Sequence, residues 1–292
     1  MPEWDVLRRV WFFSTVTVCA AAQNRANREI LTRKPPPYDH RIRYGPLPTE
    51  FADLRLPAGK GLHPLVIVIH GGFWRAAYDL EHAGSLCAAL TGTGAATWNV
   101  EYPRIGQQGG GVPGTLQSIG AAADHVAGIA AAHRLDTNRV AVLGHSAGGQ
   151  LALWLATRKD NRIRLRGAVS LAGVADLRRG WELRLGDGVV QDFLGATPDE
   201  KPERYAQANP IERLPAGIPL RLIHGDADPT VPLELSERFE QRARSLGDEA
   251  QLIRLPGAGH FELIDPRSGQ WRVVEKTVWE LLNRHPRQTG GK

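Results

Sequence analysis

The sequence predicts an α/β domain built on a mostly parallel, doubly wound sheet with helices on both faces. Apolar strand-like segments alternate along the chain with longer helical segments, which is the order that such a sheet requires. Residues 65–69 (LVIVI) and 139–143 (RVAVL) are rich in β-branched residues, as strands buried on both faces are. A serine between glycines follows the second of these strands and precedes a helical segment, which agrees with the same class.

The individual elements follow from local signals. Residues 51–56 (FADLRL) alternate in polarity and stop at a Pro-Ala-Gly triplet, which predicts a strand. A Gly-Thr-Gly triplet ends the helix predicted at 79–91, and the alanine-rich segment 115–133 predicts the next helix. The expected strands are residues 51–56, 65–69, 95–102, 139–143, 165–174, 220–224 and 250–255. The expected helices are residues 79–91, 115–133, 147–158, 232–246 and 270–284.

One segment, residues 176–215, interrupts this alternation. Its glycines and prolines lie between two predicted strands, so we expect an irregular insertion that forms a short lid. Five apolar side chains of the insertion could line an acyl or alcohol pocket, or could simply form the core of the lid. They are Trp181, Leu183, Val189, Val190 and Phe193.

Composition limits the classes of function. The chain has 292 residues, of which 42% are hydrophobic and 23% charged, as in a soluble globular protein. No apolar run reaches the ~18 residues of a membrane span, so we expect no integral membrane segment. The two cysteines, Cys19 and Cys87, exclude a disulfide framework and a cysteine-based zinc site. The net charge of +5 comes from short arginine groups and not from the block of like charges that indicates nucleic-acid binding.

The N-terminal segment, residues 1–34, is predicted to be distinct from the main domain at residues 35–292. Residues 10–22 (VWFFSTVTVCAAA) are uncharged, follow two arginines and end in three alanines, as a secretory signal does. Acidic residues before the run and hydroxyl residues within it instead favour a helix packed on the domain. Export and a cytoplasmic location both stay open, and the pattern slightly favours export. Residues 34–38 (KPPPY) predict an extended linker.

The strongest functional signal is Gly144-His145-Ser146-Ala147-Gly148, a G-x-S-x-G pattern between a predicted buried strand and a predicted helix. In this context the serine occupies a tight turn with strained backbone angles, and small neighbours allow close backbone approach. The helix N-terminus behind the serine favours the negative charge that develops in acyl transfer. We therefore predict that Ser146 is a nucleophile.

A serine hydroxyl needs a base to remove its proton and a carboxylate to orient that base. His260 is the predicted base because it follows the last predicted strand, at the carboxyl end where a parallel sheet places its site. His145 adjoins the serine but is expected to point elsewhere on the turn. Asp226 and Asp228 both follow the preceding strand and both qualify by position as the acid. The resulting order along the chain is serine, aspartate, histidine.

The HGGFW segment at residues 70–74 directly follows the first buried strand. Acyl transfer creates an oxyanion that needs preorganised N–H donors. We expect the backbone amides of Gly72, Phe73 and Ala147 to be those donors. His70 is expected to order this loop rather than to act as the base.

Together these motifs resemble the α/β-hydrolase family over about residues 51–283. The HGGFW segment is similar to that of the esterase and lipase group that includes kynurenine formamidase (arylformamidase) and small carboxylesterases. The resemblance implies that the acid is the second aspartate of an H-G-x-x-D-x-x-V-P pattern, which is Asp228. Phe73 stands where the hormone-sensitive-lipase group has a third glycine, so the resemblance leans toward the formamidase-like group without fixing the substrate.

The predicted activity is that of a serine hydrolase of small carboxylic esters or aryl formamides, acting through an acyl-enzyme on Ser146, Asp228 and His260. An exopeptidase of the prolyl-oligopeptidase-like type, which has a similar acid loop, stays open as an alternative. The second alternative is a non-catalytic α/β-hydrolase relative that works as a binding protein. We expect a small-molecule acyl substrate, no cofactor and no metal, whereas acyl length and oligomeric state are not set by the pattern.

Overall fold

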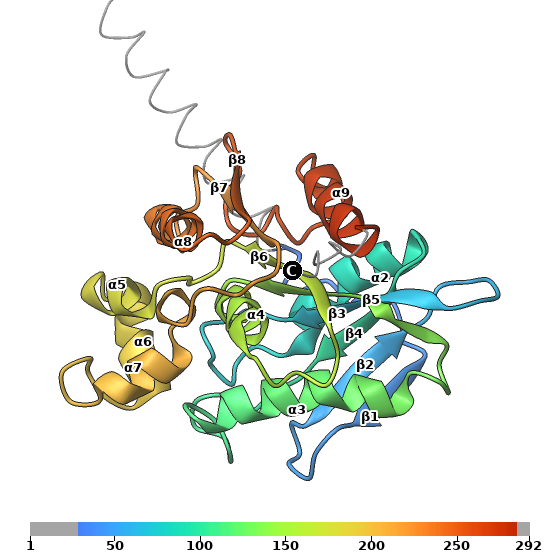
Figure 1. Ribbon diagram of the computed structural model, residues 1–292, viewed down its shortest axis with the longest axis horizontal. Helices are drawn as coiled ribbons and strands as arrows, with labels where there is room; N and C mark the ends of the chain where they lie inside the picture. The colour runs from blue at the N-terminus through green and yellow to red at the C-terminus, as the bar shows by residue number, and fades with distance from the viewer. Residues whose placement is uncertain (1–28, 285–292) are drawn as a thin grey trace, which may run out of the picture.

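The computed structural model describes residues 29–284, and the signal-like segment predicted at residues 10–22 lies outside them. Within the described residues the strands are β1 (His40–Arg43), β2 (Phe51–Arg55), β3 (His63–Ile69), β4 (Ala96–Val100), β5 (Leu135–His145), β6 (Leu165–Leu171), β7 (Leu220–Gly225) and β8 (Ala250–Leu255). They form one sheet in the order β1-β2-β4-β3-β5-β6-β7-β8. Pairing is antiparallel from β1 to β4 and parallel from β4 to β8, which confirms the predicted class (Figure 1).

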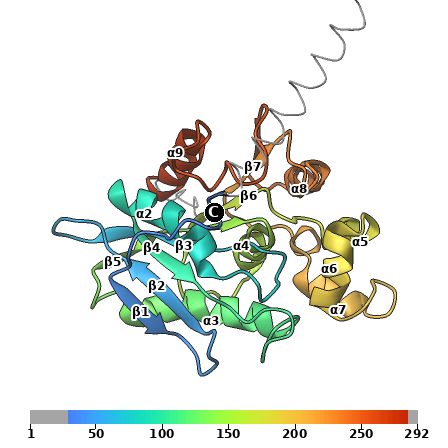
Figure 2. The same cartoon turned by 180° about the vertical axis from the view of Figure 1, so that it is seen from behind.

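Helices cover both faces of the sheet. The helices are η1 (Leu80–Ala83), α2 (Gly84–Gly92), α3 (Gly114–Ile129), α4 (Ala147–Thr157), α5 (Leu177–Glu182), α6 (Leu185–Leu194), α7 (Pro202–Ala208), η2 (Pro210–Glu212), α8 (Glu234–Ser245) and α9 (Trp271–Leu282). Helices α2 and α9 pack on one face, whereas α3, α4 and α8 pack on the other (Figures 1 and 2). In residues 29–284 no helix combines the length and apolarity needed to cross a membrane.

Strand β3 has apolar side chains at successive positions because helices cover both faces of the sheet at this strand. Its side chains at 65, 67 and 69 belong to the hydrophobic cluster under α3 and α4. Those at 66 and 68 belong to the cluster under α2 and α9. Because successive side chains of a strand point to opposite faces, both sets must be apolar when both faces are covered.

Two local expectations were incomplete. The edge strand β1 (HRIR) was not predicted, because its side chains are mostly charged and exposed and therefore show no apolar face. The helix expected at 79–91 is divided into η1 and α2. Asp79 accepts a hydrogen bond from the amide of Glu81 and so caps η1.

The insertion at residues 176–215 is helical and not irregular, which corrects the sequence-based expectation. It contains α5, α6, α7 and η2. Asp176 caps α5 by accepting from the amide of Arg179 at 3.2 Å. Pro202 and Pro210 occupy the first turns of α7 and η2, where proline is tolerated. Two of the prolines in the insertion are therefore helix-starting residues.

The described part of the N-terminal segment packs on the main domain. Ile30 is only 3% exposed and belongs to the cluster under α2 and α9. Arg33 forms two hydrogen bonds with the carboxylate of Asp265, at 3.2 and 3.3 Å. Arg55 donates to the carbonyls of two of the linker prolines. The Arg33–Asp265 bonds attach the segment to the stretch between β8 and α9 that also carries the predicted base, and Arg55 attaches the prolines to β2.

Candidate active site

Ser146 lies on a sharp turn between β5 and α4. Its backbone has φ 56° and ψ −120°, a combination that a residue with a Cβ adopts only under strain. The turn is held by the Ser146 amide, which donates to the Leu171 carbonyl at 2.8 Å, and by the Ser146 carbonyl, which accepts from Gly149 at 2.9 Å. The expected strand–turn–helix context is present, and the nucleophilic role of Ser146 stays a prediction.

The glycines of the turn are required by close backbone contacts. A Cβ at Gly144 would lie 1.9 Å from the Gly148 carbonyl oxygen. A Cβ at Gly148 would lie 2.1 Å from the Ile69 carbonyl oxygen. Both distances are far shorter than any van der Waals contact, so the G-x-S-x-G spacing follows from the packing of this turn against itself and against β3.

His260 and Asp228 meet beyond the carboxyl ends of β8 and β7. The His260 Nδ1 atom is 2.7 Å from Asp228 Oδ2, and both side chains are buried. Because a carboxylate only accepts, Nδ1–H donates, and Nε2 keeps the lone pair that a general base needs. Within the described residues Ser146 Oγ makes no hydrogen bond to His260. Catalytic hydrogen bonds of this kind commonly tighten only when substrate binds.

The geometry separates the two candidate acids. Asp226 Oδ1 accepts from the amide of Gly257 at 2.6 Å, so this carboxylate orders the turn before His260. Asp228 Oδ1 accepts from two amides of its own loop, at 2.7 and 3.0 Å, which leaves Oδ2 directed at His260. The structure thus places Asp228, and not Asp226, against the predicted base.

The charge of Asp228 is stabilised by its neighbours. Burial alone would raise the pKa of this carboxyl, but hydrogen bonds from His224 and His260 hold it well below its ordinary value. His224, which the sequence analysis did not assign to the site, has Nε2 at 3.4 Å from Asp228 Oδ2 and Nδ1 at 2.8 Å from Ser236 Oγ. Its only signal in the sequence is that it opens the H-G-x-x-D pattern.

The loop after β3 has an unusual backbone. Gly72 has φ 110°, and Phe73 and Trp74 have φ 53° and 54°, in the left-handed region that non-glycine residues avoid. The Arg75 amide donates to the Gly72 carbonyl at 3.0 Å and closes the turn. Trp74 is fully buried and stacks on Phe193 of α6, with ring centroids 4.5 Å apart. This packing holds the strained loop in place.

The same loop contacts the serine turn. A Cβ at Gly71 would lie 3.0 Å from the Cβ of Ser146, so only glycine allows this approach. Among the contacts of residues 29–284, the amides of Gly72, Phe73 and Ala147 donate to no protein acceptor. The Ala147 amide adjoins Ser146, and those of Gly72 and Phe73 lie on the loop that contacts the serine turn. Their role as oxyanion donors stays a prediction.

A buried polar network lies behind the loop. His70 Nδ1–H donates to the Gly71 carbonyl at 2.8 Å, and the Tyr102 hydroxyl donates to the His70 carbonyl at 2.9 Å. These bonds confirm that His70 orders the loop. Burial opposes the charge of Glu101, but His70 and Arg104 next to it lower its pKa overall. Neither Glu101 nor Arg104 was expected from the sequence, because each lies on a chain segment distant from the HGGFW motif.

The lid is attached to the oxyanion loop. Arg75 Nη2 donates to the Gly186 carbonyl at 2.7 Å, and a Cβ at Gly186 would lie 3.2 Å from the Phe73 ring. Three of the apolar lid side chains are fully buried and form part of the hydrophobic core: Val189, Val190 and Phe193. The other two are partly buried against that core: Trp181 and Leu183.

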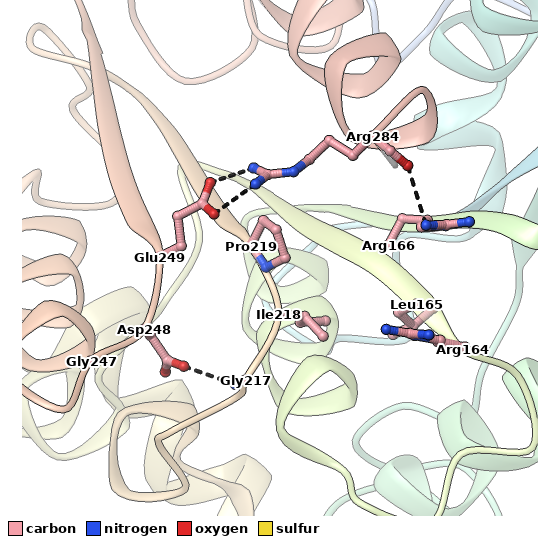
Figure 3. A pocket seen from close by; sticks show the side chains of 10 residues that line it. All are labelled: Arg164, Leu165, Arg166, Gly217, Ile218, Pro219, Gly247, Asp248, Glu249 and Arg284. Atoms are coloured by element: carbon pink, nitrogen blue, oxygen red, sulfur yellow. Dashed lines mark hydrogen bonds and ion pairs between the residues drawn. The ribbon is translucent and has the colours of Figure 1, made fainter. Parts of the chain in front are cut away.

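Two cavities of the described residues lie away from Ser146. A cavity of about 180 Å³ is found at the amino ends of β6, β7 and β8, where Glu249 pairs with Arg284 (Figure 3). Glu249 also pairs with Arg221. Those two arginines lower the pKa of Glu249 to about 2. A more open hollow of about 780 Å³ between α5 and α8 is also lined by paired charges, such as Arg238 with Asp176. Both are lined mainly by paired charges, and neither contains Ser146 or His260.

The sheet order and the serine turn between β5 and α4 define the chain as an α/β-hydrolase. Residues 52–243, about two thirds of the chain, match the sequence model of the BD-FAE family. The chain therefore belongs to the BD-FAE family, an esterase family with this fold.

Curated relatives are named as esterases. Esterase LipC of Mycobacterium tuberculosis is 33% identical over 147 residues, which cover 44% of this chain and 36% of that protein. The isoprenylcysteine alpha-carbonyl methylesterase ICME of Arabidopsis thaliana is 25% identical over 255 residues, which cover 78% of this chain and 58% of that protein. The chain thus spans roughly a third to three fifths of the length of these relatives.

Solved structures share the fold. A truncated carbohydrate esterase from gut microbiota has a TM-score of 0.73 at 21% identity and covers 86% of this chain and 100% of its own. Esterase B from Lactobacillus rhamnosis has a TM-score of 0.74 at 19% identity and covers 96% of this chain and 97% of its own. At these identities the similarity concerns the fold alone.

Proposed function

We propose that the protein is a serine carboxylesterase that cleaves small carboxylic esters. Ser146 is the nucleophile, His260 the general base and Asp228 the residue that orients the base. The observation that carries this assignment is the 2.7 Å hydrogen bond between His260 Nδ1 and Asp228 Oδ2, next to a serine on a strained turn. Membership of an esterase family and relatives named as esterases support the ester bond as the target.

The reaction proceeds in two halves on these residues. His260 Nε2 takes the proton of Ser146 as Oγ attacks the ester carbonyl, and the amides of Gly72, Phe73 and Ala147 bind the oxyanion. The imidazolium then gives its proton to the leaving alcohol, and the acyl group stays on Ser146. Water, deprotonated by His260, attacks this acyl-enzyme, and the proton returns to Ser146 as the acid departs. Asp228, held ionised by its hydrogen bonds, stabilises the imidazolium in both halves.

An aryl formamide is the second candidate substrate. The same machinery attacks a formyl carbonyl, and only the leaving group changes from an alcohol to an amine. The aromatic pair Phe73 and Trp74, which resembles that of the formamidase-like group, favours this candidate. Trp74 is stacked on Phe193 of the lid, so the pair shapes the oxyanion loop and does not by itself select the leaving group.

Two alternative functions stay open: a peptidase and a non-catalytic binding protein. Relatives from Bacillus subtilis named uncharacterized peptidases, YuxL and YtmA, are 25% and 24% identical, which keeps a short-peptide substrate as an alternative. A non-catalytic binding protein is the remaining alternative. The unpaired amides and the His260–Asp228 bond both argue against it, since they complete a catalytic set.

A rate panel tests these assignments. Hydrolysis of p-nitrophenyl acetate, butyrate and octanoate, N-formyl-kynurenine and a dipeptide anilide is measured with the purified protein and with Ser146→Ala. We expect ester turnover to fall by roughly 10⁴- to 10⁶-fold in Ser146→Ala and to stay unchanged in the control Ser245→Ala, an exposed serine of α8. Retained ester hydrolysis in Ser146→Ala would refute the assignment, and a higher kcat/KM for the formamide would select the second candidate.

A further inference from the structure

Three histidines from separate segments of the chain form a hydrogen-bonded chain at the proposed site. His82 Nε2 is 2.8 Å from His145 Nδ1, and His145 Nε2 is 3.0 Å from the backbone carbonyl of His260. All three are buried, with 8%, 1% and 4% of their surfaces exposed. His82 lies in η1 after the oxyanion loop, His145 precedes Ser146, and His260 is the proposed base.

The acceptors in this chain determine where its protons lie. A carbonyl oxygen only accepts, so His145 must carry its proton on Nε2. The pKa of His145 lies well below its ordinary value, mainly because the ring is buried and also because His260 and His82 are close to it. The ring is therefore neutral, and its Nδ1 is an unprotonated acceptor. His82 must then donate from Nε2. Its Nδ1, which has no partner among the described residues, is the lone-pair nitrogen.

The chain is enclosed by groups that keep both rings neutral. The pKa of His82 is lowered to about 3 by burial, by His70 and by His260. The Phe261 ring lies against all three histidines, with ring centroids 5.1 to 6.3 Å away. The hydrogen bond to the His260 backbone and the charge of Asp228 act in the opposite sense and do not offset the lowering of the His145 pKa.

These bonds connect the parts of the site that must keep a fixed spacing. His145 is covalently joined to Ser146 and hydrogen-bonded to the backbone of His260, so one side chain links nucleophile and base. It also supports the oxyanion loop, because a Cβ at Gly71 would lie 3.1 Å from His145 Nδ1. His82 and the His260 carbonyl bond the two ring nitrogens of His145, and together they fix the plane of this ring.

We propose that His82 and His145 are positioning residues that hold Ser146 and His260 at reacting distance, each as the neutral tautomer protonated on Nε2. This inference rests on the proposed function, since it assigns His260 as the base. Neither histidine touches substrate in this proposal. Both act through the backbone of the loop that carries His260.

The kinetic test compares His145→Phe and His82→Phe, which keep a ring but lose the hydrogen bonds. The matched control is His125→Phe, on α3, whose ring stacks on Trp98 away from the site. We expect kcat for p-nitrophenyl acetate to fall by roughly 10- to 100-fold with little change in KM, because a small misplacement of the base acts on the transition state. His145→Gln, which keeps one donor and one acceptor, should recover part of this loss. A kcat equal to that of the control in both variants would overturn the proposal.

The tautomers are tested independently of activity. Nitrogen-15 NMR of the imidazole rings in the full chain distinguishes Nδ1–H from Nε2–H, and the signals are assigned by their loss in the two variants. We expect both rings to stay neutral and protonated on Nε2 across neutral pH. A His145 signal of the Nδ1–H form would overturn the proposal whatever the kcat of His145→Phe, and His145→Gln supplies the assignment where His145→Phe does not fold. Retained activity in Ser146→Ala would instead refute the proposed function, and the spectrum would be unaffected.

Discussion

Replacement of Asp228 by asparagine is the sharpest test of the proposed triad. The change keeps the shape of the side chain, and Oδ1 can still accept from the two loop amides at 2.7 and 3.0 Å. The NH₂ group of asparagine then occupies the position of Oδ2, 2.7 Å from His260 Nδ1. Because this group donates, Nδ1 must accept, and the proton of His260 moves to Nε2.

The expected loss is large because the wrong tautomer cannot act as a base. With a proton on Nε2, His260 has no lone pair to offer Ser146. The same replacement in a serine protease triad lowers kcat by about 10⁴-fold, which corresponds to about 5.4 kcal/mol of transition-state stabilisation. We expect a loss of this order in Asp228→Asn, with KM little changed.

The control for this variant is Asp226→Asn. Asp226 is exposed, accepts one bond from the Gly257 amide and does not contact His260, so we expect activity within about twofold of the unchanged protein. Both variants are assayed for kcat and KM on p-nitrophenyl acetate, with the urea midpoint as a check of folding. Equal activity of Asp228→Asn and Asp226→Asn in folded protein would refute the assignment of the acid.

Three further outcomes follow from burial and close contact. Gly148→Ala would force a Cβ to 2.1 Å from the Ile69 carbonyl, so we expect the free energy of unfolding to fall by roughly 2–4 kcal/mol; an unchanged urea midpoint would contradict this. Burial lowers the pKa of His82 from 6.5 to about 3, so the unfolded chain binds more protons between these values and stability falls as the pH drops below 6.5. His82→Gln should flatten the pH dependence of the urea midpoint by up to about 1.4 kcal/mol per pH unit, and an unaltered slope would disprove it. Burial raises the pKa of the Cys87 thiol to about 12, so iodoacetamide should modify Cys87 only after unfolding, as peptide mass spectrometry would show; rapid labelling of the folded protein would argue against this burial.

Local patterns predicted those parts of the fold in which neighbouring residues determine the structure. The serine turn was predictable because Gly144 and Gly148 lie next to the serine in sequence as well as in space. The buried strand β3 was predictable because helices on both faces demand apolar residues throughout. Strand β1 was not, since its charged residues pair at an edge and leave no apolar pattern.

Contacts between distant segments were not predictable from spacing. By position in the sequence, Asp226 and Asp228 were equally good candidates for the acid, and the choice of Asp228 depended on a family resemblance. Only the folded loop shows which of the two carboxylates faces His260. The bond between His82 and His145 joins residues 63 positions apart, and no local motif marks it. Local motifs indicated the groups proposed to react, but not the contacts proposed to hold them in place.

The packing of residues 29–33 sets a limit on proteolytic processing. A protease that cuts after the alanines at 20–22 would leave Ile30 in its apolar contact and Arg33 on Asp265. Trimming beyond Arg33 would uncover apolar surface and release the carboxylate that this arginine holds near the base-bearing loop. Residues 29–33 must therefore stay in place to keep these contacts, and Arg55 likewise holds the proline-rich stretch that follows them.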